Sequence, residues 1–129
     1  MTITINNPPE LEIDAWLAKY GRTMTADKVI ERRIVWNLLK HLDAAGFDVP
    51  YVYDGEELES TPTHKSAMEI VFNLDEAVLK VQHRETGRRY SVVLVLGNGA
   101  DVLSDYSYPS DKADPFNVAM DAFDSDAYV

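Results

Sequence analysis

The chain has 129 residues, of which 46% are hydrophobic and 26% charged, and this balance is typical of a globular domain and excludes wholesale disorder. Its 22 acidic and 12 basic residues give a formal net charge of −10, which disfavours direct binding to nucleic acids and anionic membranes, because both attract proteins through Lys and Arg. The chain has no cysteine, which excludes disulfides, thiolate metal sites and cysteine nucleophiles.

At this length we expect one domain over residues 1–129, with residues 1–8 flexible. The segment Met1–Pro9 has neither a basic start nor a long apolar core, so it does not resemble a signal peptide. No run of the sequence approaches the roughly 18 apolar residues that a membrane span requires. We therefore expect a soluble cytoplasmic protein, a location that the lack of cysteine also suits.

Two helices are predicted in the N-terminal third. The first covers about residues 9–20, because Pro9 suits a first helical turn and Gly21 a stop. The second begins after Thr25, whose hydroxyl can cap a helix, and ends at Gly46, because glycine readily adopts a left-handed conformation. Apolar residues recur within it at three- and four-residue spacings, in a stripe wide enough to predict burial on more than one side.

The next segments are predicted to be a strand, a loop and a helix. Phe47–Tyr53 has strand character, and Pro50 favours a place at the sheet edge because proline cannot donate a hydrogen bond to a neighbouring strand. Glu56–Thr63 follows as an acidic loop. Ser66–Leu74 fits a helix with Thr63 or the segment's own serine as the cap, although its Ile-Val-Phe run leaves a strand as the alternative.

Residues 76–108 predict a three-stranded antiparallel meander. Ala77–His83 alternates apolar and polar side chains, as a half-buried strand does. Tyr90–Leu96 is apolar on both faces, which places it inside the sheet. The glycines of Gly97–Gly99 supply positive torsions for a hairpin turn into a last strand, Val102–Tyr108.

The C-terminal region predicts a short helix, which Asp114 can cap. The expected fold class is therefore α+β, with N-terminal helices packed on a small antiparallel sheet, made of the three-stranded meander plus an edge strand, and a short C-terminal helix. The expected core residues are Trp16, Ile30, Ile34, Leu38, Leu42, Ile70, Leu79, Val92, Leu94, Leu96 and Phe116.

No motif of a known catalytic chemistry is complete. His41, His64 and His83 fall on three different predicted elements without the spacing of a metal site, so we interpret them as surface or edge-strand residues. Gly97–Gly99 lacks the third glycine and the lysine of a phosphate-binding loop. No Gly-x-Ser-x-Gly motif supports a serine hydrolase. We therefore predict no catalytic residue, no metal and no cofactor.

The acidic residues leave one enzymatic alternative open. Asp101 and Asp105 flank one predicted strand, and two spaced carboxylates can hold a divalent ion. The alternative function is therefore a carboxylate-dependent hydrolase that uses a metal. Because such pairs also arise by chance in a chain with 22 acids, we favour a function without catalysis.

Tyrosines beside carboxylates favour a protein-binding surface. Tyr51 and Tyr53 share one face of their predicted strand, and so do Tyr106 and Tyr108, because alternate residues of a strand point the same way. Tyrosine offers apolar area and a hydroxyl at low entropic cost, which suits an interface.

Two stretches, Leu96–Tyr108 and Ser66–Asp75, resemble segments of small uncharacterised acidic proteins of phages and other mobile elements. This resemblance implies an accessory protein that acts by binding a protein of the host or of the element. It assigns a role to no particular residue.

We predict a non-enzymatic, acidic protein-binding module in which Asp101, Asp105, Tyr106 and Tyr108 contact a partner protein with a basic surface. A further alternative is a DNA mimic, whose acids imitate phosphates and occupy a nucleic-acid-binding protein. The oligomeric state stays open, because Trp36 on a broadly apolar helix suits a dimer face and core packing equally well.

Overall fold

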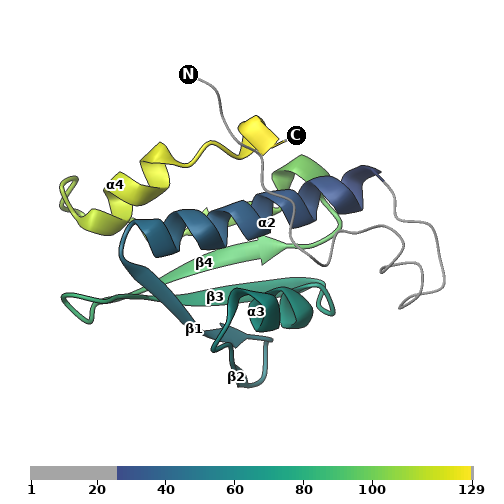
Figure 1. Cartoon of the computed structure of the whole chain (residues 1–129), viewed down its shortest axis with the longest axis horizontal. Helices are drawn as coiled ribbons and strands as arrows, with labels where there is room; N and C mark the ends of the chain where they lie inside the picture. The colour runs from purple at the N-terminus through teal and green to yellow at the C-terminus, as the bar shows by residue number, and fades with distance from the viewer. Residues whose placement is uncertain (1–25, 129) are drawn as a thin grey trace.

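The computed structural model describes residues 26–128, which form an α+β fold of three α-helices and a five-stranded sheet (Figure 1). The elements in chain order are α2 (Ala26–Ala44), β1 (Phe47–Tyr53), β2 (Leu58–Ser60), α3 (His64–Val71), β3 (Glu76–His83), β4 (Arg89–Val95), the 3-10 turn η2 (Gly99–Asp101), β5 (Leu103–Tyr106), α4 (Pro115–Ala122) and the 3-10 turn η3 (Ser125–Tyr128). The predicted helix at 9–20, the Thr25 cap, Trp16 and the segment 1–8 lie outside the described residues.

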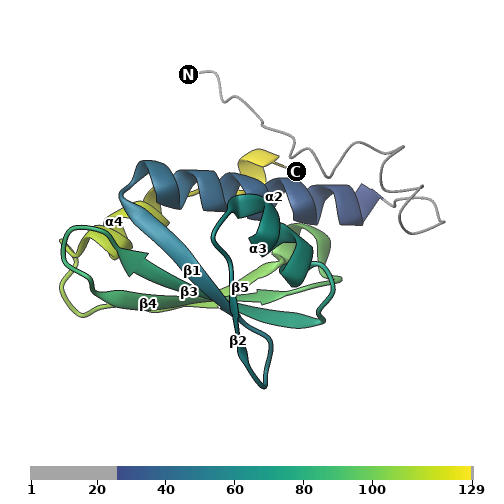
Figure 2. The same ribbon diagram turned by 60° about the horizontal axis from the view of Figure 1, so that its bottom comes forward.

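The sheet has the strand order β2-β1-β3-β4-β5, and every neighbouring pair is antiparallel. Strands β3, β4 and β5 therefore confirm the predicted meander. In the central pair Leu79 lies opposite Val92, and Lys80 lies opposite Ser91. All three α-helices lie on one side of the sheet (Figure 2). None of the described helices combines the length and apolar composition needed to span a bilayer.

Helix α2 confirms the predicted second helix. Its buried stripe includes Ile34, Leu38 and Leu42, each with no exposed surface. Trp36 is half-buried and packs against the core. Gly46 follows the helix with a φ of 94°, a left-handed conformation that favours glycine and ends the helix before β1.

The structure corrects the predicted edge position of β1, which lies between β2 and β3. The register with β3 shifts between Asp48 and Tyr51, so Pro50 lies at a bulge, where a strand can do without a donated N–H. The Pro50 carbonyl still accepts a hydrogen bond from the Thr61 amide at 2.9 Å. A proline, which has no N–H to donate, can therefore be placed in a sheet either at an edge strand or at a bulge, and Pro50 lies at a bulge.

The edge belongs instead to β2, inside the segment that was predicted as a loop. Leu58 pairs with Tyr53 across the β1–β2 turn. The Asp54 carboxylate closes this turn by accepting the amides of Glu56 and Glu57, each at 2.8 Å. These backbone hydrogen bonds hold the pKa of Asp54 below its usual value. The local turn signal was readable, but three residues are too few to predict a strand from pattern alone.

Helix α3 confirms the predicted helix, although it ends at Val71 rather than Leu74. Thr63 is its cap: the Thr63 hydroxyl accepts the Ser66 amide at 3.1 Å, and the Ser66 hydroxyl accepts the Thr63 amide at 3.1 Å. This reciprocal arrangement satisfies two amides that a helix start otherwise leaves without a partner.

Replacing Thr63 by Ala should lower the free energy of unfolding by about 1 kcal/mol, because the first turn of α3 loses its capping oxygen. Urea denaturation followed by circular dichroism measures this change. Thr63→Ser keeps the oxygen and should cost much less. An equal loss in both variants would show that the methyl group of Thr63, and not its cap, stabilises the helix.

The turn between β4 and β5 confirms the predicted hairpin and its glycines. Gly97 and Gly99 have φ values of 94° and 58°. Glu31, a buried residue of α2, accepts hydrogen bonds from the amides of Gly97 and Asn98. A buried carboxylate requires such donors, and these fix the hairpin turn to the helix.

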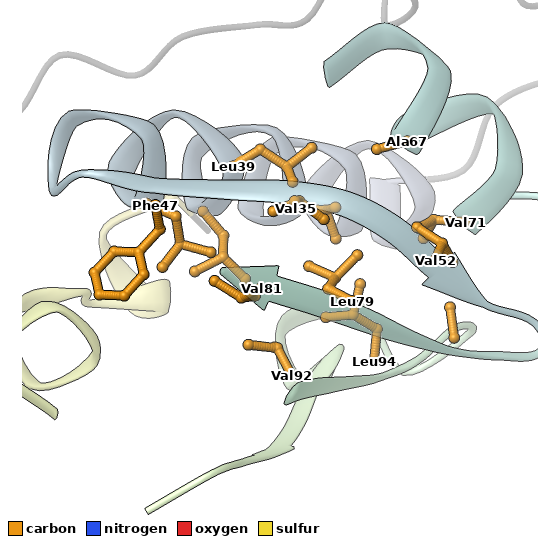
Figure 3. Close-up of a cluster of buried hydrophobic side chains, with 14 of the residues drawn as sticks. Val35, Leu39, Phe47, Val52, Ala67, Val71, Leu79, Val81, Val92 and Leu94 are labelled. Atoms are coloured by element: carbon orange, nitrogen blue, oxygen red, sulfur yellow. The ribbon is translucent and has the colours of Figure 1, made fainter. Parts of the chain in front are cut away.

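The core lies between the helices and the sheet (Figure 3). Seven of the predicted core residues are buried, namely Ile34, Leu38, Leu42, Leu79, Val92, Leu94 and Phe116. Ile30, Ile70 and Leu96 are only partly buried and pack against this cluster. Ile70 is the last but one residue of α3, and Leu96 lies just beyond the end of β4.

Candidate functional site

The sheet has a second face that no described helix covers (Figure 2). Along β3, Leu79 and Val81 are fully buried against the helices, whereas Val78 and Lys80 point to the other side and are half-buried. Residues that lie opposite one another on paired strands point to the same side of the sheet, so the pairing identifies the residues of β1, β2, β4 and β5 that share the side of Val78 and Lys80. We call this surface the open face, and define it by Tyr51, Tyr53, Leu58, Val78, Lys80, Arg89, Ser91, Val93 and Asp105.

Two large apolar side chains are exposed on the open face. Tyr51 is 44% exposed and Leu58 is 57% exposed. They come from the paired strands β1 and β2, and both line the same depression. Tyr53 shares the face of Tyr51, as predicted, because the buried Val52 lies between them on the opposite side. Neighbouring exposed apolar groups of this kind mark interaction surfaces.

The depression has a volume of about 310 Å³. Its lining residues are Tyr51, Leu58, Lys80, Arg89, Tyr90, Ser91 and Ser107. This volume is at the lower end of the roughly 300–1,000 Å³ that is usual for small-ligand sites. The lining combines apolar area with two cations and several hydroxyls, so the depression can hold an amphipathic group.

Lys80 and Arg89 make the depression positive in a protein whose net charge is −10. The Lys80 ammonium donates to the Ser91 hydroxyl at 3.3 Å and lies 5.8 Å from the centre of the Tyr53 ring. Within residues 26–128, neither cation has a carboxylate at ion-pair distance. The depression is therefore suited to an anion.

The other two arginines of the β3–β4 hairpin are bound to carboxylates. Arg84 pairs with Asp48 at 2.8 Å and with Asp43, and the hydrogen bond that the Arg84 guanidinium donates to Asp48 raises the pKa of Arg84. Arg88 pairs with Asp114 at 2.9 Å. Among the described residues, Arg84 and Arg88 are therefore paired with carboxylates, whereas Lys80 and Arg89 of the same hairpin are not.

The four residues predicted to contact a partner lie on different sides of β5. Asp105 is opposite Val93 and belongs to the open face. Tyr106 points to the helices and is half-buried, with its ring 6.4 Å from that of Phe116. Asp101 lies in η2, before the strand, and Tyr108 lies beyond its end and is 65% exposed. Tyr106 and Tyr108 do not share a strand face, because β5 ends at Tyr106.

The histidines confirm their predicted separation on α2, α3 and β3, but His83 corrects the predicted surface or edge location. His83 is 8% exposed in an internal strand, with its ring 4.8 Å from that of Phe47. His41 lies 2.7 Å from the Ala119 carbonyl through Nε2 and so joins α2 to α4. In the described part of the chain, no group of three or more histidines and carboxylates is arranged to hold a metal ion.

Sequence reasoning missed the depression, although it found most of the strands. The alternation around Lys80 indicated a half-buried strand, which is a signal that one face of β3 is partly accessible. The alternation does not reveal the strand register, which places Lys80 opposite both Tyr51 and Ser91. The chain matches no protein-family model, no curated protein and no solved structure.

Proposed function

We propose that this chain is a non-enzymatic module that binds another protein through the open face. The observation that carries the proposal is the pair of exposed apolar side chains, Tyr51 and Leu58, at one depression on a sheet face that no described helix covers. Apolar groups surrounded by polar ones are typical of interaction sites in water-soluble proteins, and tyrosine is enriched at interfaces.

The proposed partner has a basic surface, because acids flank the open face on two sides. The turn between β1 and β2 carries Asp54, Glu56 and Glu57, and Asp105 lies on the open face from β5. Such charges steer a basic partner toward the site and repel nucleic acids. We include in this proposal an accessory role in a phage or another mobile element, in the cytoplasm.

Affinity capture from a lysate followed by binding measurements on the purified partner tests the proposal. Replacing Tyr51 and Leu58 together by Ser should weaken binding of that partner by at least about tenfold, because each side chain contributes an apolar contact worth about 1–3 kcal/mol. Isothermal titration calorimetry measures the affinity. Both side chains are substantially exposed, so the thermal unfolding of the double variant should stay close to that of the original chain.

Val118→Ser is the matched control, because Val118 is 56% exposed but lies on α4, on the helix side of the sheet. The control should bind the partner normally. Higher salt should weaken binding if the partner is basic. Equal affinities for the original chain and the Tyr51/Leu58 double variant would overturn the open face as the interface, and binding that strengthens with salt would overturn the basic partner.

A further inference from the structure

We propose that the depression between Lys80 and Arg89 binds one acidic side chain, an Asp or Glu that the partner carries on an otherwise apolar segment. This inference rests on the proposed function and deepens it, because it specifies the group that enters the centre of the open face. The depression is lined by both cations, by the apolar pair Tyr51 and Leu58, and by serine hydroxyls.

The first step of the argument is the environment of the two cations. Lys80 is half-buried in an internal strand, where an ammonium loses part of its hydration and benefits from an anionic partner. Its polar contact in the described part of the chain is the Ser91 hydroxyl at 3.3 Å, a neutral acceptor. A carboxylate beside Lys80 and Arg89 would supply the opposite charge that both side chains lack there.

The second step is the hydroxyls at the same place. The Ser91 hydroxyl accepts from Lys80, and the Ser107 hydroxyl accepts from the Ser91 amide at 2.9 Å. Among the described residues neither hydroxyl donates to another group, so each retains a hydrogen that can be donated to an anion. Two cations and two hydroxyls can together satisfy both oxygens of one carboxylate.

The third step distinguishes a carboxylate on an apolar segment from a free phosphate. Tyr51 and Leu58 line the depression with apolar area, which inorganic phosphate cannot cover but a side chain and its neighbours can. The chain also carries a net charge of −10, which opposes a dianion more strongly than a single carboxylate. A positive centre with apolar walls and an outer acidic rim therefore selects a partner with the reverse pattern, one acid on an apolar segment with basic groups farther out.

Titration of the ¹⁵N-labelled chain with short capped peptides tests this inference without the partner. The probes are acetyl-Leu-Glu-Leu-amide, the same peptide with Gln in place of Glu, and inorganic phosphate. We expect the Glu peptide to shift the amide signals of Lys80, Arg89 and Ser91 in a saturable way. The Gln peptide should bind at least fivefold more weakly, and phosphate should produce only small shifts that do not saturate.

Lys80→Met, which keeps the length of the side chain, should reduce the affinity for the Glu peptide at least fivefold. The matched control is Lys65→Met, because Lys65 is an exposed cation on α3, on the helix side of the sheet. Equal binding of the Glu and Gln peptides, an absence of saturable shifts, or unchanged binding by Lys80→Met would overturn the carboxylate site. Saturation of the same signals by phosphate at lower concentration than by the Glu peptide would overturn it in favour of a phosphoryl ligand.

These outcomes are independent of those of the Tyr51 and Leu58 variant. A peptide result that overturns the carboxylate site leaves the apolar interface standing, since that interface is tested with the intact partner. Conversely, the double variant could bind its partner normally while the Glu peptide still shifts the Lys80 amide signal in a saturable way. The proposed function would then fail, and the anion site would remain.

Discussion

Replacing Asp114 by Ala should lower the free energy of unfolding by about 2–4 kcal/mol, because the variant loses a helix cap and leaves a buried hydroxyl without its acceptor. The Asp114 side chain is almost completely buried at the start of α4. Its carboxylate accepts hydrogen bonds from the Phe116 amide, the Tyr90 hydroxyl and the Arg88 guanidinium, each at 2.9 Å. Urea denaturation followed by circular dichroism measures the loss.

The size of this effect follows from the two roles that one buried carboxylate combines. Tyr90 belongs to β4, 24 residues before Asp114, so the same oxygens cap a helix and fix it to the sheet. Burial, and then the hydrogen bond to Asp114, raise the pKa of the Tyr90 phenol above its usual value. Tyr90 therefore stays protonated at neutral pH and donates to Asp114.

Two further variants separate the contributions. Asp114→Asn keeps Oδ1, which caps the helix and accepts from Tyr90. It replaces Oδ2, and with it the charge and the acceptor that face Arg88. Because Arg88 is largely exposed and can turn toward water, this change should cost about 1 kcal/mol. Tyr90→Phe combined with Asp114→Ala should cost less than the sum of the two single changes, because no hydroxyl is then left without a partner. A loss in Asp114→Asn as large as in Asp114→Ala would show that the ion pair, and not the cap, fixes α4.

The elements that were predictable from the sequence are those whose signals are local. Asp114 and Thr63 predict the starts of their helices, because a capping side chain accepts a hydrogen bond from an amide only two or three residues away. Gly46 and Gly97 have the positive φ values that their positions in the sequence suggested. The β3–β4–β5 meander follows from alternation and short turns, which also act over a few residues.

The features that were not predictable depend on which strands become neighbours. Pro50 suggested an edge strand, but β1 gained a second neighbour from the segment that follows it in the chain. Tyr106 appeared to be a surface tyrosine until α4 placed Phe116 beside its ring. In each case the local sequence permitted the observed structure without selecting it.

The candidate site was even less predictable from local sequence than these features. Its depression takes residues from β1, β2, β3, β4 and the segment after β5, so no window of the sequence contains it. Lys80 and Arg89 line the same depression only because β3 and β4 pair in this register. A shift of that register by one residue would turn the side chains of one strand to the opposite face. Pairing, and not composition, creates the positive centre of this acidic protein.

Replacing Phe116 by Ala should lower the free energy of unfolding by about 3–5 kcal/mol, because it removes a fully buried aromatic ring and leaves a cavity that the helix cannot close. The Phe116 ring is stacked on that of Tyr90, with ring centres 4.4 Å apart and planes 6° apart. It also meets Phe47 at 5.7 Å and Tyr106 at 6.4 Å, both close to edge-on. This one side chain of α4 thus contacts β1, β4 and β5.

Thermal and urea unfolding of Phe116→Ala measure this loss, with Val118→Ala as the control on the same helix. Val118 is 56% exposed, so its truncation should change stability by less than about 0.5 kcal/mol. A domain of this size typically has 5–15 kcal/mol of stability, so Phe116→Ala should remain folded at low temperature yet unfold much earlier on heating. Below that transition it should still bind the Glu peptide, because Phe116 lies on the helix side of the sheet and Lys80 on the open face. Loss of peptide binding while the variant is still folded would show that the two faces of the sheet are energetically coupled, and that the open face depends on the packing of α4.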